Sequence, residues 1–280
     1  MKYGVIISPT TDTIQPGDLA RELETRGFDS LWFPEHTHMP VKARKGDVPD
    51  SYGLTYDPFI ALTWAAAASR YLLLGTGICL MAQRDPIITA KTISTLDQLS
   101  RGRVRIGVGG GWNRPEMENH GVEFSRRWNS VEEKVCAMKE IWTHQPASFE
   151  GEQIQFEPMV SGPKPFQDPH PPVFMGATGK EALERVVRYC DGWIPLASEL
   201  DDLEGSLKQL KELARQAGRD FNKFELSIFA APRDPKELQR FANLGATRAI
   251  FMVRPRKPEE VLEDLDELSD LTASAKSIVD

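Results

Sequence analysis

The stretch RVRIGVGGGWNRPE, residues 103–116, joins a strand-like apolar run to three consecutive glycines and a tryptophan. Glycines weaken a strand because they have no side chain to pack. They do, however, let the backbone approach a flat or anionic group closely. A second stretch, PVFMGATGKE at 172–181, also ends a strand-like run in Gly-x-x-Gly and opens a helix. Two such strand ends followed by helices predict a bound cofactor that carries a phosphate.

Strand-like and helix-like segments alternate along the whole chain. Short apolar runs, typical of parallel strands buried on both faces, fall at 3–8, 30–34, 72–80, 104–108, 173–176, 192–196, 225–230 and 248–253. Helical patterns fall between them at 18–26, 58–69, 86–99, 129–143, 180–189, 203–217, 235–244 and 258–268. Eight β–α pairs in 280 residues predict an α/β fold, a (β/α)₈ TIM barrel forming a single domain over 1–280.

A doubly wound sheet is the structural alternative. It would usually carry a glycine fingerprint after its first strand, and that position holds Ser8-Pro9-Thr10. Two segments exceed the usual loop length: residues 37–56 after the second strand and residues 147–171 before the fifth. Long loops in compact domains are usually functional or mobile, and the second segment reads as an insertion before strand five.

The composition limits the classes of function. A net charge of −7 argues against a general nucleic-acid or membrane-surface role. The three cysteines form no Cys-x-x-Cys pair and are interpreted as reduced core thiols. No apolar run is long enough to span a bilayer, and the N-terminus enters a strand without a long apolar signal region. We therefore expect a cytoplasmic protein whose partner is a small-molecule substrate, with no nucleic acid and no membrane.

Glu35 and His36 come directly after the second strand, at the active rim of the predicted barrel. Histidine is the side chain best suited to move a proton near neutral pH. Two other interpretations remain: a metal site built on His36 and His38, or a polar strand end in which the histidine is structural. Because the eighth strand ends in Val253-Arg254 without a carboxylate, and the other histidines fall in helix ends and loops, no metal is predicted.

Glycine and tryptophan positions give weaker signals. Gly75 and Gly77 interrupt the third strand, which indicates a bulge or a close ligand. The glycines at 107–111 do not match the dinucleotide fingerprint, and residues 174–180 are not a Walker A loop. The segment 174–180 is then interpreted either as an anion site, made of helix N–H groups with Thr178 and Lys180, or as a tight turn capped by the threonine. Trp32, Trp112 and Trp193 could line an apolar pocket or pack in the core.

Taken together, the motifs resemble the luciferase-like monooxygenase superfamily. Its branch of deazaflavin (coenzyme F420)-dependent oxidoreductases is the most similar. The segments that carry the resemblance follow one another over nearly the whole chain: SLWFPEH at 30–36, LGTG at 74–77, AKT at 90–92, TLDQLSRGR at 95–103, GVGGGWNRPE at 107–116, GPKP at 162–165, PPV at 171–173 and DGW at 191–193.

The resemblance implies a barrel of the luciferase-like type with its cofactor at the carboxyl-terminal rim. It also implies a non-proline cis peptide at Gly77-Ile78, which forms a bulge behind the cofactor ring. The cofactor-binding positions that it implies are Thr76, Gly77 and Ile78 at this bulge, Gly110, Gly111 and Trp112 beside the cofactor, and Gly176, Ala177, Thr178 and Gly179 around its phosphate. Glu35 and His36 would lie near the reactive edge of the ring, and the likeness favours a homodimer. Some sugar-phosphate dehydrogenases of the branch have a carboxylate where Trp112 stands, so activity on a sugar phosphate is not expected.

These observations predict an F420-dependent oxidoreductase that moves a hydride between the deazaflavin and a small organic substrate. In this hypothesis His36 moves the accompanying proton and Glu35 orients the imidazole. An FMN-dependent monooxygenase on the same scaffold is the alternative; a metal-dependent barrel hydrolase and a non-catalytic flavin-binding relative stay open. Four basic residues are candidates for binding the acidic tail of F420, or are plain surface charges: Arg84, Arg114, Lys180 and Arg254.

Overall fold

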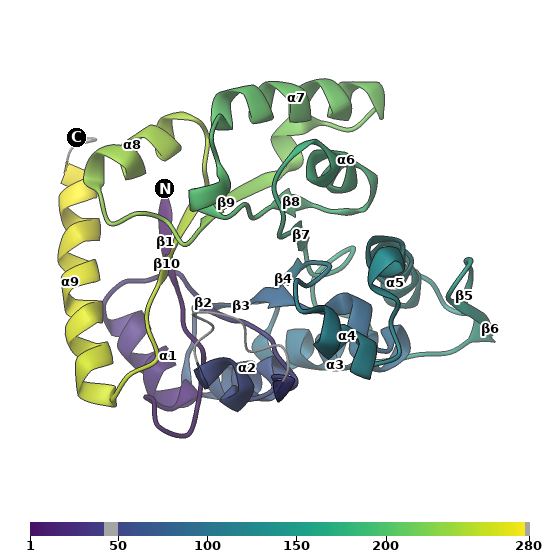
Figure 1. Ribbon diagram of the computed structural model, residues 1–280, viewed down its shortest axis with the longest axis horizontal. Helices are drawn as coiled ribbons and strands as arrows, with labels where there is room; N and C mark the ends of the chain where they lie inside the picture. The colour runs from purple at the N-terminus through teal and green to yellow at the C-terminus, as the bar shows by residue number, and fades with distance from the viewer. Residues whose placement is uncertain (42–49, 278–280) are drawn as a thin grey trace.

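The computed structural model describes residues 1–41 and 50–277, and within them eight parallel strands close into a barrel (Figure 1). The first and last strands pair directly, with Lys2 opposite Arg248, so the sheet has no free edge. In order around the barrel the strands are β1 (Lys2–Ile6), β2 (Ser30–Phe33), β3 (Leu73–Cys79), β4 (Val104–Val108), β7 (Val173–Met175), β8 (Gly192–Trp193), β9 (Glu225–Phe229) and β10 (Arg248–Met252). The predicted (β/α)₈ barrel is confirmed. The boundary of a single domain at 1–280 stays a prediction.

Helices cover the outside of the barrel (Figure 1). Several begin at an Asp-Pro pair: Asp57, Asp85 and Asp234 each accept a hydrogen bond from a backbone N–H in the first turn, and the proline follows at the first helical position. The helices that follow the barrel strands are α1 (Pro16–Thr25), α2 (Pro58–Ala68), α3 (Pro86–Ser100), α5 (Arg127–Thr143), α6 (Lys180–Tyr189), α7 (Leu203–Gln216), α8 (Pro235–Asn243) and α9 (Pro258–Ser277).

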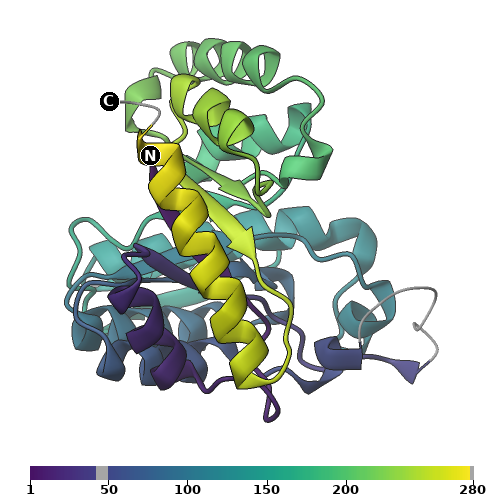
Figure 2. The ribbon, with the colours of Figure 1, turned by 90° about the vertical axis from the view of Figure 1, so that its left-hand side faces the viewer.

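The C-terminal helix α9 closes one side of the barrel, as Figure 2 shows. Arg26, just after α1, donates from Nε to Asp266 of α9 over 2.7 Å, which joins the two ends of the chain. In the described part of the chain, none of the helices combines the length and the apolar composition that crossing a membrane requires.

Aromatic and branched side chains fill the inside of the barrel. Trp32, Phe174, Ile194 and Ile250 pack there with Ile6, and a side chain at Gly75 would overlap the Trp32 ring. Gly75 therefore makes room for a tryptophan and not for a ligand. Trp32 packs in the core and does not line a pocket.

Residues 147–171 contain more order than the sequence suggested. They include an antiparallel hairpin of β5 (Ala147–Glu150) and β6 (Gln155–Met159), which packs on α5 and extends away from the barrel (Figure 1). Phe149 and Phe156 stack across it with ring centroids 6.2 Å apart. The description of this whole segment as a loop is wrong, because two strands of four or five residues are too short to show a clear period. The short helix α4 (Arg114–Asn119) was also not predicted.

Candidate active site

The carboxyl ends of β2, β3, β4 and β7, which are neighbours in the barrel, bring the predicted site segments to one rim. Glu35 and His36 follow β2, Gly77-Ile78 lies in β3, glycines 109–111 follow β4, and residues 176–179 follow β7. The segments lie together because parallel strands of a barrel all end at the same face. Of the long segment 37–56, residues 42–49 lie outside the described part of the chain.

His36 forms a buried pair with Glu116 of α4. The distance between His36 Nδ1 and Glu116 Oε2 is 2.8 Å, and the two side chains are 8% and 0% exposed. The other carboxylate oxygen accepts the backbone N–H of Thr37 over 2.9 Å. An ionised carboxylate is only an acceptor, so the proton of the neutral imidazole lies on Nδ1. The pair therefore fixes the tautomer and leaves Nε2 as the ring nitrogen that can accept a proton.

The charge of Glu116 is stabilised in place. Burial alone would raise the pKa of its carboxyl, but the hydrogen bond and charge of His36 and the Thr37 N–H outweigh it, and the pKa lies below the ordinary 4.5. Asn113 begins α4 by accepting the Glu116 backbone N–H over 3.3 Å, which turns this residue toward β2. Glu116 is thus an ionised, oriented partner for the histidine.

Two aromatic rings hold the imidazole from other sides. Tyr52 stacks on His36 with centroids 5.1 Å apart, and Trp112 meets it edge-on at 5.6 Å. Trp112 is also 52% exposed, so it presents a large apolar surface at the rim. Aromatic side chains beside a few placed polar groups are typical of sites that bind small molecules.

Glu35 does not orient His36, so this part of the sequence hypothesis is wrong. Its carboxylate accepts the backbone N–H of Leu80 over 2.7 Å and the Nε–H of Arg84 over 2.6 Å. Arg84 also donates to Asp57, the N-cap of α2, over 2.8 Å. Glu35 is buried and joins the ends of β2 and β3 to α2. Arg84, one of the candidates for the acidic tail, is neutralised within this cluster.

The expected cis peptide is present at Gly77-Ile78. Side chains at Gly109 and Gly176 would overlap the Ile78 side chain. These two glycines therefore give space to a side chain of β3, and not directly to a flat ligand. Thr76 donates its hydroxyl to the Gly107 carbonyl over 2.9 Å, which ties β3 to β4 just below the bulge.

The loop after β7 leads into the start of α6, which has no side-chain cap among the described residues. Gly179, the N-cap of α6, has φ of +84°, and its ideal side-chain position meets no atom within 4 Å. No side chain caps α6 within the described structure, so the first N–H groups are open to a ligand. Trp193 holds this loop by donating Nε1–H to the Ala177 carbonyl over 2.7 Å. Thr178 does not cap the helix, because its hydroxyl bonds Glu199 at 2.6 Å.

The second histidine of the predicted alternative, His38, lies on the outer side. Its Nδ1 is 2.9 Å from the Thr37 hydroxyl, which is also 2.7 Å from His120 Nε2. Among the described residues, no group of three or more His, Cys, Asp or Glu side chains is placed to hold a metal ion. His36 and His38 therefore form hydrogen bonds with different residues, Glu116 and Thr37.

Sequence reasoning missed Glu116, Tyr52 and the role of Arg84. Glu116 stands in the quoted motif at 107–116, and a signal for it existed. It is the first acidic residue after the glycines of a segment that ends at the same rim as His36.

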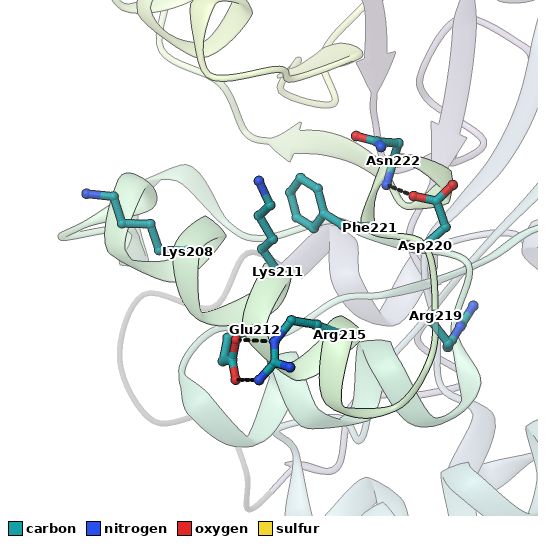
Figure 3. A pocket seen from close by; sticks show the side chains of 8 residues that line it. All are labelled: Lys208, Lys211, Glu212, Arg215, Arg219, Asp220, Phe221 and Asn222. Carbon is teal, nitrogen blue, oxygen red and sulfur yellow. Dashed lines mark hydrogen bonds and ion pairs between the residues drawn. The ribbon is translucent and has the colours of Figure 1, made fainter.

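A cavity of about 460 Å³ lies elsewhere, between α7 and the turn Phe221–Lys223 (Figure 3). It is lined by Lys208, Lys211, Glu212, Arg215, Arg219, Asp220, Phe221 and Asn222. None of the predicted site residues lines it, so it is separate from the rim described above.

Comparison with known proteins shows which family the chain resembles. The sequence model of the luciferase-like monooxygenase family matches residues 8–267. An uncharacterized protein of Mycobacterium tuberculosis is 37% identical over 278 residues, with 96% of this chain and 98% of the relative covered. A 5,10-methylenetetrahydromethanopterin reductase of Methanolobus tindarius is 25% identical over 264 residues, covering 94% and 74%. An FMNH₂-dependent dimethylsulfone monooxygenase of Pseudomonas putida is 29% identical over 159 residues, covering 56% and 44%.

Two solved structures show the same fold. A monooxygenase from Streptomyces bottropensis superposes with a TM-score of 0.79 at 18% identity, covering 96% of this chain and 98% of that one. An F420-dependent secondary alcohol dehydrogenase superposes with a TM-score of 0.76 at 19% identity, covering 97% and 98%.

Proposed function

We propose that this chain, which belongs to the luciferase-like monooxygenase family and is an oxidoreductase, moves a hydride between coenzyme F420 and a small organic substrate. The observation that carries the proposal is the buried His36–Glu116 pair at the rim, beside the bulge at Ile78 and the open start of α6. The bound deazaflavin would supply the hydride chemistry. The protein would supply orientation, exclusion of water and a proton.

The residues present fit such a cofactor. Gly110, Gly111 and Trp112 would border its ring system, with Ile78 behind it. The free N–H groups at the start of α6 would bind its phosphate through the positive end of the helix. Thr178 and Ala177 lie in the same loop, which Trp193 fixes.

His36 would move the proton at Nε2. With Nδ1–H held by Glu116, Nε2 can take a proton from a substrate hydroxyl as the hydride leaves, and the carboxylate then stabilises the imidazolium. In the reverse direction the imidazolium returns this proton to a carbonyl oxygen. Tyr52 and Trp112 would exclude water from the imidazole. Glu35 would act only by holding the strand ends in place.

The named relatives support F420. The alcohol dehydrogenase that shares the fold is F420-dependent, and it covers nearly the whole chain. An F420-dependent tetrahydromethanopterin reductase from Methanopyrus kandleri shares the fold as well. The candidate alternative, an FMN-dependent monooxygenase, is supported by the Pseudomonas relative over a shorter part of the chain, and the monooxygenase from Streptomyces bottropensis shares the fold over nearly the whole chain.

A side-by-side titration tests the cofactor. Purified protein is titrated anaerobically with F420 and with FMN, and binding is followed by cofactor fluorescence. The proposal expects F420 to bind more tightly. Tighter binding of FMN, together with oxygen consumption when reduced FMN is supplied, would replace the proposal with the monooxygenase.

A homodimer is part of the proposal, as is a cytoplasmic location. Two large, exposed apolar side chains on α2 and α3 support the homodimer. Ile60 is 74% exposed and Ile88 is 68% exposed, and these two helices pack side by side. Covering such side chains with a second copy would remove apolar surface from water. Light scattering after gel filtration should give twice the 31.4 kDa chain mass, and Ile60→Glu should reduce it to one chain.

A further inference from the structure

Three arginines from three helices gather around two aromatic rings. Arg114 of α4 and Arg127 of α5 both lie against Phe124, with guanidinium carbons 4.5 and 3.8 Å from the ring centroid. Arg185 of α6 lies 4.3 Å from the Trp128 ring centroid, and Arg127 lies 5.8 Å from the same ring. The rings hold the flat guanidinium groups in place.

This arginine cluster (Arg114, Arg127 and Arg185) lies between the two predicted cofactor loops. The Trp128 ring is packed against Gly110, close enough that a side chain there would come within 3.0 Å of it. Arg185 stands in the second turn of α6, whose N-cap is Gly179. The start of α6, the proposed phosphate site, is therefore less than two helical turns from Arg185.

The positive charge of the cluster is poorly balanced. Burial lowers the pKa of Arg127, and the neighbouring charges of Arg185 and Arg114 lower it further. Within the described structure Arg127 forms no ion pair, and its Nε is buried without a hydrogen-bond acceptor. The acids beside the other two, Glu118 at 3.9 Å and Glu181 at 3.3 Å, are strongly exposed. Such surface pairs contribute little.

Three other positively charged side chains near the rim lie outside this cluster and have acidic partners. Arg84 is neutralised by Glu35 and Asp57, and Lys180 lies 4.0 Å from Glu184 on the exposed face of α6. Arg126, adjacent to Arg127 in sequence, turns away and pairs with Glu152 near the hairpin. The cluster of three is therefore a specific arrangement and not part of a generally basic surface.

We propose that the arginine cluster binds the chain of carboxylates that follows the phosphate in F420. This inference rests on the proposed function. A guanidinium presents a fork of N–H donors that matches a carboxylate. Arg127 uses one donor, at Nη1, on the Phe124 carbonyl, and Arg185 uses one, at Nη2, on the exposed Glu181. FMN ends at a single phosphate, for which the start of α6 suffices, whereas three separated forks fit an anion with several carboxylates. The cluster would then favour F420 over FMN.

The test compares cofactors cut to different lengths. Binding to the folded protein is measured by fluorescence titration for F420 with its glutamate tail, for F420 without the glutamates, and for FMN. The variants are Arg127→Gln and Arg185→Gln. Arg126→Gln removes the same charge from the same region and serves as the control.

Each of the two variants should weaken binding of tailed F420 by about tenfold, the equivalent of about 1.4 kcal/mol. Neither should alter binding of the form without glutamates, and Arg126→Gln should change neither. The loss should shrink at high salt, because dissolved ions screen the attraction between the guanidinium groups and the carboxylates.

Equal losses for the tailed and tailless forms would show that the arginines bind the phosphate, and would overturn the inference while leaving the proposed function intact. Unchanged binding of tailed F420 in folded variants would overturn it as well. If the unaltered protein binds no deazaflavin, the proposed function fails and the inference fails with it.

Discussion

Replacing Glu116 tests the central pair of the site without knowledge of the substrate. The carboxylate is fully buried; its two closest donors are His36 Nδ1 and the Thr37 backbone N–H, and the Thr37 hydroxyl also donates to it over 3.4 Å. In Glu116→Ala both donors lose their acceptor. A buried unpaired donor costs about 1–3 kcal/mol. Because Thr37 is exposed and water can reach it, we expect the free energy of unfolding to fall by about 2–3 kcal/mol.

Glu116→Gln is the sharper variant. Its amide oxygen can still accept the Thr37 N–H, but its NH₂ group then faces His36 Nδ1. The imidazole must therefore accept at Nδ1 and carry its proton on Nε2, the opposite tautomer. This change leaves the shape intact and removes the proton acceptor at Nε2. Catalysis should fall by about 10²–10⁴-fold, the usual contribution of a general base.

The assay combines urea unfolding with ¹⁵N-histidine NMR, which distinguishes the two tautomers. Since the folded state holds the pKa of Glu116 below 4.5, its charge stabilises the fold fully above the unfolded carboxyl value of about 4.3. That stability is lost as pH falls through the lower folded pKa. The free energy of unfolding of the unaltered protein and that of Glu116→Gln should therefore become more similar as the pH falls. An unchanged urea midpoint for Glu116→Ala, or an Nδ1–H signal that persists in Glu116→Gln, would refute the reasoning.

The remaining predictions concern proton transfer by His36, anion binding at the start of α6, and the ion pair between Glu35 and Arg84. His36→Ala should lower kcat by about 10²–10⁴-fold with little change in cofactor affinity, whereas the exposed His144→Ala control should leave both unchanged; equal rates for both variants would make His36 structural. Gly179→Asp should weaken cofactor binding at the start of α6, and Glu199→Gln should strengthen it by removing a negative charge beside Thr178; titrations that show no change in either would move the phosphate elsewhere. Glu35→Gln should reduce the free energy of unfolding by about 3 kcal/mol, because a buried ion pair is broken; an unchanged urea midpoint would contradict the role of Glu35 in joining the strand ends to α2.

Much of the fold could be predicted from local patterns. Eight apolar runs, each followed by a helical pattern, correspond to the eight barrel strands, because a parallel strand buried on both faces must be apolar along its length. The Asp-Pro pairs mark helix starts for a chemical reason that is equally local. The hairpin at 147–159 was missed because its strands are short and mostly exposed, so no period stands out.

The sequence alone determined that His36, Ile78 and the two glycine loops meet at one rim, since strand ends of a parallel barrel share a face. Only the tertiary structure decided which side chains pair. His36 binds Glu116, eighty positions away, and not its neighbour Glu35. Gly109 and Gly176 make room for a side chain of another strand. Such pairings depend on side-chain direction and on packing between distant segments, and no periodicity along the chain records them.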